Sequence, residues 1–147
     1  GIGSDDNKSY GFNVLNINDI NDISVGRYHI GLTTKNKICY VFGNNQSGQC
    51  GDHHDIRCFN KPKQFINDAI IHVKCGGYNT FIKTTNNEYY SCGFNGGNIC
   101  LNNIKQGGII TEPTKISMQY LYNKIGSNNP IIDIIPGVLE THILQRS

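Results

Sequence analysis

Residues 20–50 read INDISVGRYHIGLTTKNKICYVFGNNQSGQC, and residues 70–100 read IIHVKCGGYNTFIKTTNNEYYSCGFNGGNIC. The two stretches lie fifty residues apart and are identical at nine positions. These positions are Ile20/Ile70, Gly26/Gly76, Tyr28/Tyr78, Thr34/Thr84, Asn36/Asn86, Tyr40/Tyr90, Gly43/Gly93, Asn45/Asn95 and Cys50/Cys100. A period of this length is typical of solenoids, propellers and other repeat architectures. The sequence therefore predicts one structural unit copied along the chain.

Two partial copies flank the complete ones. The stretch IIDIIPG at 131–137 matches INDISVG at 20–26, and GSDDNKSYG at 3–11 matches GNNQSGQCG at 43–51. The chain thus reads as half a unit, two full units and half a unit. The spacing lengthens from 50 to 61 residues before the last copy, so we expect an insertion there. Its apolar residues, Tyr120, Leu121, Tyr122 and Ile125, fall on one broad helical face, which predicts a short helix or a loop.

Each full unit reads as four short strands. The first ends at a glycine, the second begins near His29, and the third is the aromatic ICYVF (38–42) or EYYSC (88–92). Lys35-Asn36 and Asn86-Asn87 suit a tight hairpin because Asn tolerates positive φ. A long polar loop then leads to KPKQF (61–65) or EPTKI (112–116), with proline near the start of the fourth strand.

Four strands per unit at this period predict an all-β fold made of propeller blades of four antiparallel strands. We expect two complete blades and two half blades. The expected division of the chain is 1–16 for the end of a preceding blade, 17–66 and 67–116 for the two blades, 117–130 for the inserted loop or short helix, and 131–147 for the start of a following blade.

The G-x-Y-H or G-x-Y-N turn, the strand ending in FGNNQSGQCG (42–51) and the KPKQF stretch together resemble the regulator-of-chromosome-condensation repeat. The resemblance covers about residues 2–144. It implies a seven-bladed β-propeller, and a closed propeller usually needs at least four blades. We therefore expect this chain to be a segment of a longer propeller, with several chains closing one ring as the alternative.

Composition narrows the classes of function. The net charge is +2 without clustered Lys or Arg, so there is no strong nucleic-acid signal. The apolar runs are too short to span a bilayer, and the start lacks the apolar stretch of a signal peptide, so an intracellular location is favoured. Four of the six cysteines lie in strand-like stretches, which favours buried thiols over disulfides or metal ligands. No cofactor is expected.

Two groups of residues are candidates for a site. Cys50, His53, His54 and Cys58 in CGDHHDIRC have donor types that zinc accepts, but a solvated loop is the favoured interpretation and no metal is assigned. His29 in the first turn, matched by Asn79, is expected to hold the turn by hydrogen bonds rather than to catalyse.

The favoured function is a non-enzymatic scaffold that binds another protein or neighbouring blades of the same polypeptide or assembly. The turns at 26–29, 76–79 and 137–140 are expected on one face, where loops on a rigid frame mediate recognition. The partner-binding candidates are Arg27, Tyr28, His29, Gly77, Tyr78 and Asn79. The resemblance also implies guanine-nucleotide exchange on a small GTPase as an alternative, and a structural role in a larger assembly, including a viral one, is the third.

Overall fold

The structure is a computed structural model that describes residues 14–147 of the chain. Strands dominate it, with one short 3-10 helix, η1 (Gly96–Asn98), and one α-helix, α1 (Met118–Ile125). The strands are β1 (Ile20–Val25), β2 (His29–Thr34), β3 (Cys39–Asn44), β4 (Cys58–Gln64), β5 (Ile70–Cys75), β6 (Asn79–Thr84), β7 (Tyr89–Phe94), β8 (Ile109–Lys115), β9 (Ile131–Pro136) and β10 (Thr141–Gln145). No helix within the described range is long and apolar enough to cross a membrane.

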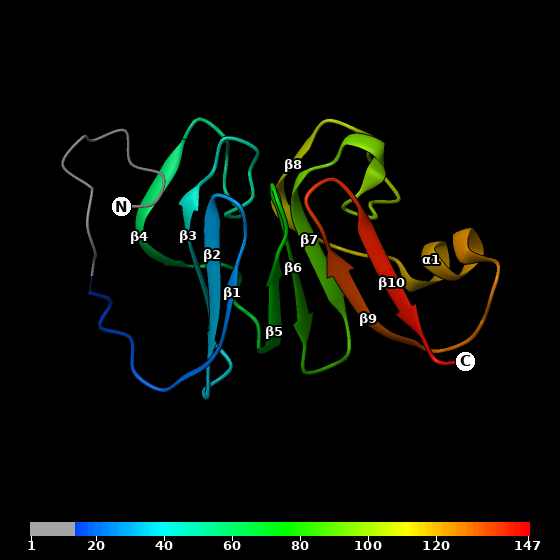
Figure 1. Ribbon diagram of the computed structural model, residues 1–147, viewed down its shortest axis with the longest axis horizontal. Coiled ribbons are helices and arrows are strands. Elements are labelled where there is room, and N and C mark those ends of the chain that lie inside the picture. The colour runs from blue at the N-terminus through cyan, green and yellow to red at the C-terminus, as the bar shows by residue number, and fades with distance from the viewer. Residues whose placement is uncertain (1–13) are drawn as a thin grey trace.

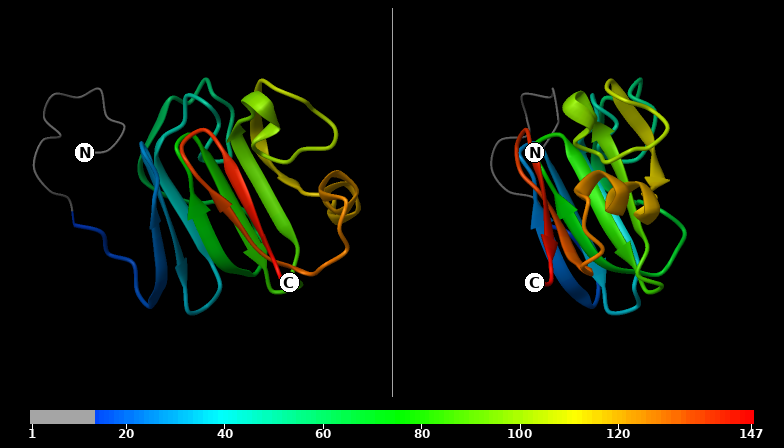
Figure 2. Two further views of the ribbon diagram at one scale, coloured as in Figure 1. Left: turned by 45° about the vertical axis from the view of Figure 1, so that its right-hand side comes forward. Right: turned by 90° about the vertical axis from the view of Figure 1, so that its right-hand side faces the viewer.

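The strands form three antiparallel sheets that stand side by side (Figure 1). The first two sheets have the strand orders β1-β2-β3-β4 and β5-β6-β7-β8, and the third is the hairpin of β9 and β10. Neighbouring sheets contact each other through the first strands of each sheet. Strand β5 contacts β1 and β2, and β9 contacts β5 and β6 (Figure 2). The prediction of an all-β fold made of four-stranded propeller blades is confirmed. The half blade expected at the N-terminus falls mostly on residues 1–13, outside the described residues.

The hairpin between the second and third strands differs from the expected one in its first copy. Thr34 N–H donates to the Ile38 carbonyl (2.9 Å), and Lys37 N–H donates to the Thr34 carbonyl (2.9 Å). The loop therefore has three residues, and the third of them takes the left-handed conformation. That residue is Lys37 (φ 67°) in the first blade and Asn87 (φ 61°) in the second. The expectation of positive φ at Lys35-Asn36 was wrong. The type of turn, and not the presence of Asn, decides which residue takes the left-handed conformation.

The outer strands β4 and β8 begin three residues earlier than expected, at Cys58 and Ile109. Pro62 and Pro113 consequently lie inside these strands. In each blade the pairing with the third strand shifts register there, between the Val41 and Gly43 pairs in the first and the Ser91 and Gly93 pairs in the second. An edge strand with a bulge tolerates proline, because the missing N–H has no ladder partner to lose.

Two clusters of buried side chains hold the sheets together. The first lies between the two blades and includes Val41, Val73, Ile82 and five of the six cysteines. These five thiols are free and buried, and for four of them, Cys39, Cys75, Cys92 and Cys100, the strand-like surroundings predicted it; the fifth is Cys50. Buried Cys behaves as a small apolar side chain. The second cluster packs Phe81 of β6 against Ile134 of β9 and Leu121 of α1.

Helix α1 lies in the segment where an insertion was expected. Ser117 caps its N-terminus by accepting a hydrogen bond from Tyr120 N–H, and Gly126 ends it in the left-handed conformation (φ 74°). Leu121 is its buried residue. The helix lies beside the third sheet and closes the outer flank of the second cluster (Figure 1).

The face of the first blade that points away from the second is open. Val73 and Cys75 of β5 lie against Gly31 of the first blade and are 1% and 8% exposed. Their counterparts in β1, Ile23 and Val25, are 56% and 69% exposed. In the second blade these positions are buried because the first blade covers them. In the first blade the same positions are exposed, since no preceding blade is described.

The turn glycines bring successive blades into backbone contact. Arg27 N–H donates to the Gly76 carbonyl (3.3 Å), and Gly77 N–H donates to the Gly137 carbonyl (2.9 Å). A Cβ at Gly26 would lie 2.5 Å from the Gly76 oxygen, and one at Gly76 would lie 2.7 Å from the Gly137 oxygen. These approaches are closer than any Cβ allows, so the spacing between blades requires glycine at both positions.

Substitution of Gly76 by alanine is therefore expected to destabilise the fold strongly. The added methyl group would clash with Asn79 Oδ1 as well as with the Gly137 oxygen. We expect Gly76→Ala to cost about 2–3 kcal/mol of unfolding free energy, measured by urea denaturation. Gly97→Ala is the matched control: it has φ 64° but nothing within 4 Å of a Cβ, so only the left-handed backbone opposes it, at about 1 kcal/mol. Equal losses in the two variants would contradict the steric explanation.

Candidate functional site

The turns at the start of the second strand of each blade gather aromatic and basic side chains on one surface. The rings of Tyr28 and Tyr78 lie with centroids 5.6 Å apart and planes tilted by 42°. The Arg27 guanidinium carbon lies 5.3 Å from the Tyr28 ring centroid and 5.9 Å from that of Tyr78. Phe94 meets Tyr78 edge to face at 6.4 Å. We call Arg27, Tyr28 and Tyr78 the tip cluster.

His29 ties the first turn to the second blade. Its Nε2 lies 3.0 Å from the Asn79 carbonyl oxygen and 2.8 Å from Thr80 Oγ1. Because the carbonyl can only accept, Nε2 carries the proton and donates to both. Thr80 Oγ1 in turn donates to the Gln49 carbonyl at 2.6 Å, which brings the loop after β3 into the same network.

This network keeps the imidazole of His29 neutral. His29 is 1% exposed, and burial lowers the pKa of His29 from 6.5 to about 4, while its bond to the Asn79 backbone opposes that shift. Nδ1 has no hydrogen-bond partner among the described residues and lies against Gly26. A proton added there would create an unpaired buried charge, which is unfavourable.

The third turn repeats part of this arrangement. Thr141 Oγ1 donates to the Ile99 carbonyl at 2.6 Å, as Thr80 Oγ1 does to the Gln49 carbonyl one blade earlier. Asn79 occupies the position of His29, but neither polar atom of its amide reaches a nitrogen or oxygen partner in the described part of the chain. The amide lies instead beside the thiol of Cys100, whose pKa burial raises to about 12. The shorter Asn side chain leaves the bond to the third turn unmade.

The six residues predicted to contact a partner therefore divide into two groups. Arg27 and Tyr28 are exposed and Tyr78 is half-buried, so the tip cluster can be reached from outside. His29, Gly77 and Asn79 are buried. Their side chains or backbone hold the turns together, so they are not part of a contact surface, and that portion of the prediction was wrong.

Asn45 and Asn95 organise the long loop that follows the third strand, a role that sequence reasoning missed. Both are 0% exposed. Asn45 Nδ2 donates to the carbonyls of Asp52, His53 and Ile56, and its Oδ1 accepts from Cys50 N–H (2.9 Å). Asn95 repeats the pattern on its own loop with Lys105, Gly107 and Cys100. Their identity at the fifty-residue spacing was the signal that could have revealed this role.

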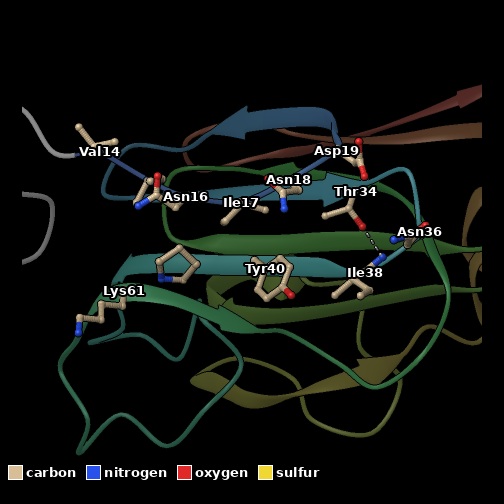
Figure 3. Close-up of a pocket in the computed structure, with 12 residues that line it drawn as sticks. Val14, Asn16, Ile17, Asn18, Asp19, Thr34, Asn36, Ile38, Tyr40 and Lys61 are labelled. Carbon is tan, nitrogen blue, oxygen red and sulfur yellow. Dashed lines mark hydrogen bonds between the residues drawn. The ribbon is translucent and has the colours of Figure 1, made fainter.

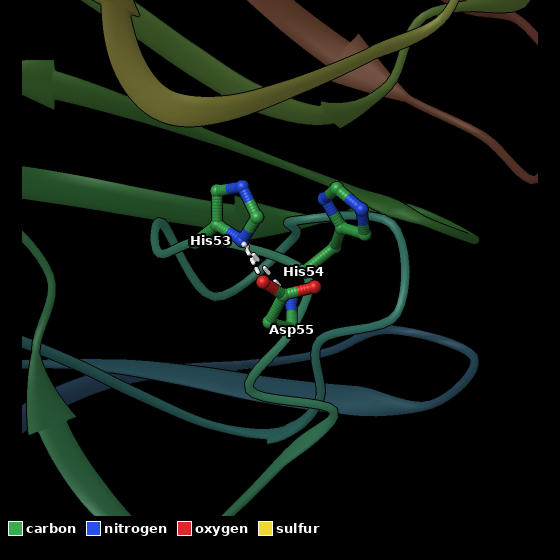
Figure 4. A group of neighbouring side chains, drawn as sticks. All are labelled: His53, His54 and Asp55. Atoms are coloured by element: carbon green, nitrogen blue, oxygen red, sulfur yellow. Dashed lines mark hydrogen bonds and ion pairs between the residues drawn. The ribbon is translucent and has the colours of Figure 1, made fainter.

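The candidate metal ligands of the CGDHHDIRC stretch do not come together as a set of four. Cys50 is buried, and its Sγ donates to the Gly43 and Asn44 carbonyls. Cys58 Sγ donates to Asn60 Oδ1 at 3.2 Å. Among the described residues the structure instead groups His53 and His54 with Asp55, all three of them exposed (Figure 4).

A groove of about 610 Å³ lies on the outer side of the first blade. It is lined by residues 14–19, by the hairpin from Thr34 to Tyr40, and by Lys61 and Pro62 (Figure 3). Lys61 lies at one end and Asp19 at the other, and the rest of the lining is apolar or uncharged.

Comparison with known proteins assigns the repeat. Residues 38–82 match the regulator of chromosome condensation (RCC1) repeat. The chain is 30% identical over 108 residues to the mouse serine/threonine-protein kinase Nek9, and 30% identical over 107 residues to an RCC1 repeat-containing protein of Dictyostelium discoideum. The matched stretch runs from the third strand of one blade to the second strand of the next. The repeat that the sequence comparison recognises therefore begins about half a blade after the start of a structural blade.

Solved structures show the same fold at low identity. Yeast RCC1 (Prp20), in its complex with Kap60, superposes with a TM-score of 0.68 over 91% of this chain at 19% identity, and human WBSCR16 with 0.61 over 80% at 23%. The chain covers 32% and 29% of those two proteins, 11% of Nek9 and 22% of the Dictyostelium protein. Residues 38–82 thus match an RCC1 repeat, the described residues fold as propeller blades, and the chain spans under a third of the length of each of these relatives.

Acid is expected to weaken the fold through His29. Between pH 6.5 and about 4 the unfolded chain takes up a proton that the folded His29 refuses, so stability is complete above pH 6.5 and falls as the pH drops. The slope from this one group reaches roughly 1.4 kcal/mol per pH unit. Urea denaturation at pH 7.5, 6 and 5 measures this effect. The difference in unfolding free energy between the wild type and His29→Asn should shrink as the pH falls. A constant difference across this range would contradict the assignment.

The reverse exchange in the second blade is expected to stabilise the protein. Asn79→His places an imidazole where Nε2–H can donate to the Glu140 carbonyl and to Thr141 Oγ1, as His29 does one blade earlier. At pH 8 we expect a gain of about 1 kcal/mol and a rise in melting temperature, measured by calorimetry. Asn79→Ala is the matched control, because it removes the amide without supplying the bond, and a variant Asn79→His no more stable than this control would contradict the prediction.

Proposed function

We propose that this chain of RCC1 repeats is a non-enzymatic scaffold that binds a protein partner through the tip cluster. The observation that carries the proposal is the stack of Arg27 on two tyrosines from successive blades, on a surface open to solvent. Tyr28 is 43% exposed, and the third turn adds the exposed Val138 and Leu139 to the same row.

The residue types support a protein contact. Tyr and Arg are enriched at protein interfaces and among the residues that dominate binding energy. The flat guanidinium of Arg27, placed over the rings of Tyr28 and Tyr78, keeps its N–H edge for a partner. Carboxylates are the acceptors that match this edge in a bidentate way. An acidic segment of a protein partner therefore fits the tip cluster best.

The frame beneath the tip cluster supports tight recognition. Backbone bonds from Arg27 to Gly76 and from Gly77 to Gly137 join the three turns, and buried His29 bonds to Asn79 and Thr80 below them. A contact surface whose backbone is already fixed loses less conformational entropy on binding. The tip cluster can thus bind a partner as a preformed surface.

The open face of the first blade suggests a second set of contacts. Ile23 and Val25 are exposed at positions that a neighbouring blade buries in the next unit. Blades that cannot cover both of their faces stack on a neighbour. The natural occupant of this face is another blade of the same polypeptide or assembly.

The relatives suggest which partners to test first. Yeast Prp20 has been characterised for its binding to Gsp1p and to histones. Guanine-nucleotide exchange on a small GTPase, which the resemblance of the repeat implies, is the alternative function for the present chain. We favour binding without exchange.

Binding should depend on the tip cluster. We expect Arg27→Ala and Tyr28→Ala each to weaken binding by about tenfold or more, measured by biolayer interferometry against a panel of small GTPases and core histones. Arg146→Ala is the matched control, because Arg146 is exposed beyond the last strand and away from the turns. Binding that tolerates both tip substitutions would contradict the assigned surface, and release of bound guanine nucleotide stimulated by the chain would favour exchange over scaffolding.

A further inference from the structure

We propose that the loop between β3 and β4 of the first blade binds a divalent transition metal of the zinc class through His53, His54 and Asp55. This site is separate from the tip cluster and does not depend on the proposed function. Each of the three residues offers a ligand atom, and these atoms all lie within 4.8 Å of one another (Figure 4). All three side chains are exposed, so an ion can reach them.

The distance between two of the ligand atoms matches a metal site. His53 Nδ1 lies 3.2 Å from Asp55 Oδ2. Two zinc–ligand bonds of about 2.0 Å at a tetrahedral angle place their ligand atoms about 3.3 Å apart. The same Nδ1 accepts a hydrogen bond from Asp55 N–H (3.3 Å between the nitrogens), which the bound ion would replace.

His54 completes the set. Its ring stacks on that of His53 with centroids 4.5 Å apart and an angle of 26°. The exposed His54 side chain can close the remaining distance to a shared ion by rotating about its own bonds, without movement of the backbone. Three protein ligands leave a further position for water or for a donor from a partner.

The backbone that carries the ligands is already held in place. Buried Asn45 donates to the carbonyls of Asp52, His53 and Ile56. The Asp52 carboxylate accepts from His53 N–H at 2.7 Å. The metal therefore has to order side chains only, which favours binding.

The ligand types select the ion. Imidazole nitrogen suits Zn²⁺, Ni²⁺ and Cu²⁺, whereas Mg²⁺ and Ca²⁺ prefer sites made of oxygen ligands. Cys50, a candidate ligand from the sequence, is unsuitable because burial raises the pKa of its thiol to about 12 and a metal binds the thiolate. The corresponding loop of the second blade, 95–108, has no histidine and no carboxylate. The site is therefore a feature of the first blade and not of the repeat.

Titration of the metal-free protein with ZnCl₂ by isothermal calorimetry tests the proposal. We expect one ion per chain, and His53→Ala and His54→Ala should each weaken binding at least about tenfold. His72→Ala and His142→Ala are the matched controls, because these histidines are exposed elsewhere on the molecule and should leave binding unchanged. Circular dichroism checks that every variant remains folded.

Cys58→Ser and the spectrum with Co²⁺ distinguish this site from a cysteine site. We expect Cys58→Ser to bind as the wild type does, and bound Co²⁺ to show ligand-field bands without a sulfur-to-metal charge-transfer band. Loss of binding in Cys58→Ser, or a charge-transfer band, would overturn the assignment in favour of a Cys and His site. Absence of saturable Zn²⁺ binding, or binding that survives His53→Ala and His54→Ala together, would overturn it altogether.

Discussion

The close approach of backbone to backbone at the turn glycines is the constraint on which the rest of the structure depends. Arg27 N–H bonds to the Gly76 carbonyl, and Gly77 N–H bonds to the Gly137 carbonyl, because no Cβ keeps the turns apart. This contact sets the distance between blades. It thereby lets His29 reach the backbone of Asn79 and lets the cysteines and branched side chains between the sheets close into one core.

Much of the fold could be predicted from the sequence because the repeat fixes equivalent positions. Gly26 and Gly76, and Tyr28 and Tyr78, mark the same turn in two blades, and alternation of apolar residues marks the strands. The left-handed residue of the first hairpin escaped prediction, since Lys37 has no preference for positive φ and follows the turn type instead. The early start of β4 and β8 was not predicted either. A proline in the sequence indicates the start of a strand more often than a bulge inside it.

The candidate sites could be predicted only in part, because burial decides which side chains are accessible to a ligand or partner. Adjacent residues in the GRYH turn point in opposite directions, so Tyr28 reaches solvent while His29 lies in the interior. A single sequence shows the residue types of such a turn but not which of them face inward. In the CGDHHDIRC loop the spacing suggested Cys50 as a companion of the two histidines, whereas the fold buries Cys50 and brings Asp55 beside them. Asn45 shows the same limit, since an asparagine in a polar loop gives no sign of being fully buried.

Each contact between successive blades joins two different surfaces, which has a consequence for self-association. The turns of the first two blades donate an N–H to the blade that follows in the chain, and His29 donates its ring proton. Cys75 N–H and Thr80 Oγ1 of the second blade donate in return to Ser24 Oγ and the Gln49 carbonyl of the first. Such an interface is heterologous: its two sides are different surfaces, and it cannot be satisfied by a twofold axis. Copies that joined through these faces would add head to tail, and the angle between successive blades would then decide whether the assembly closes into a ring or grows into a filament.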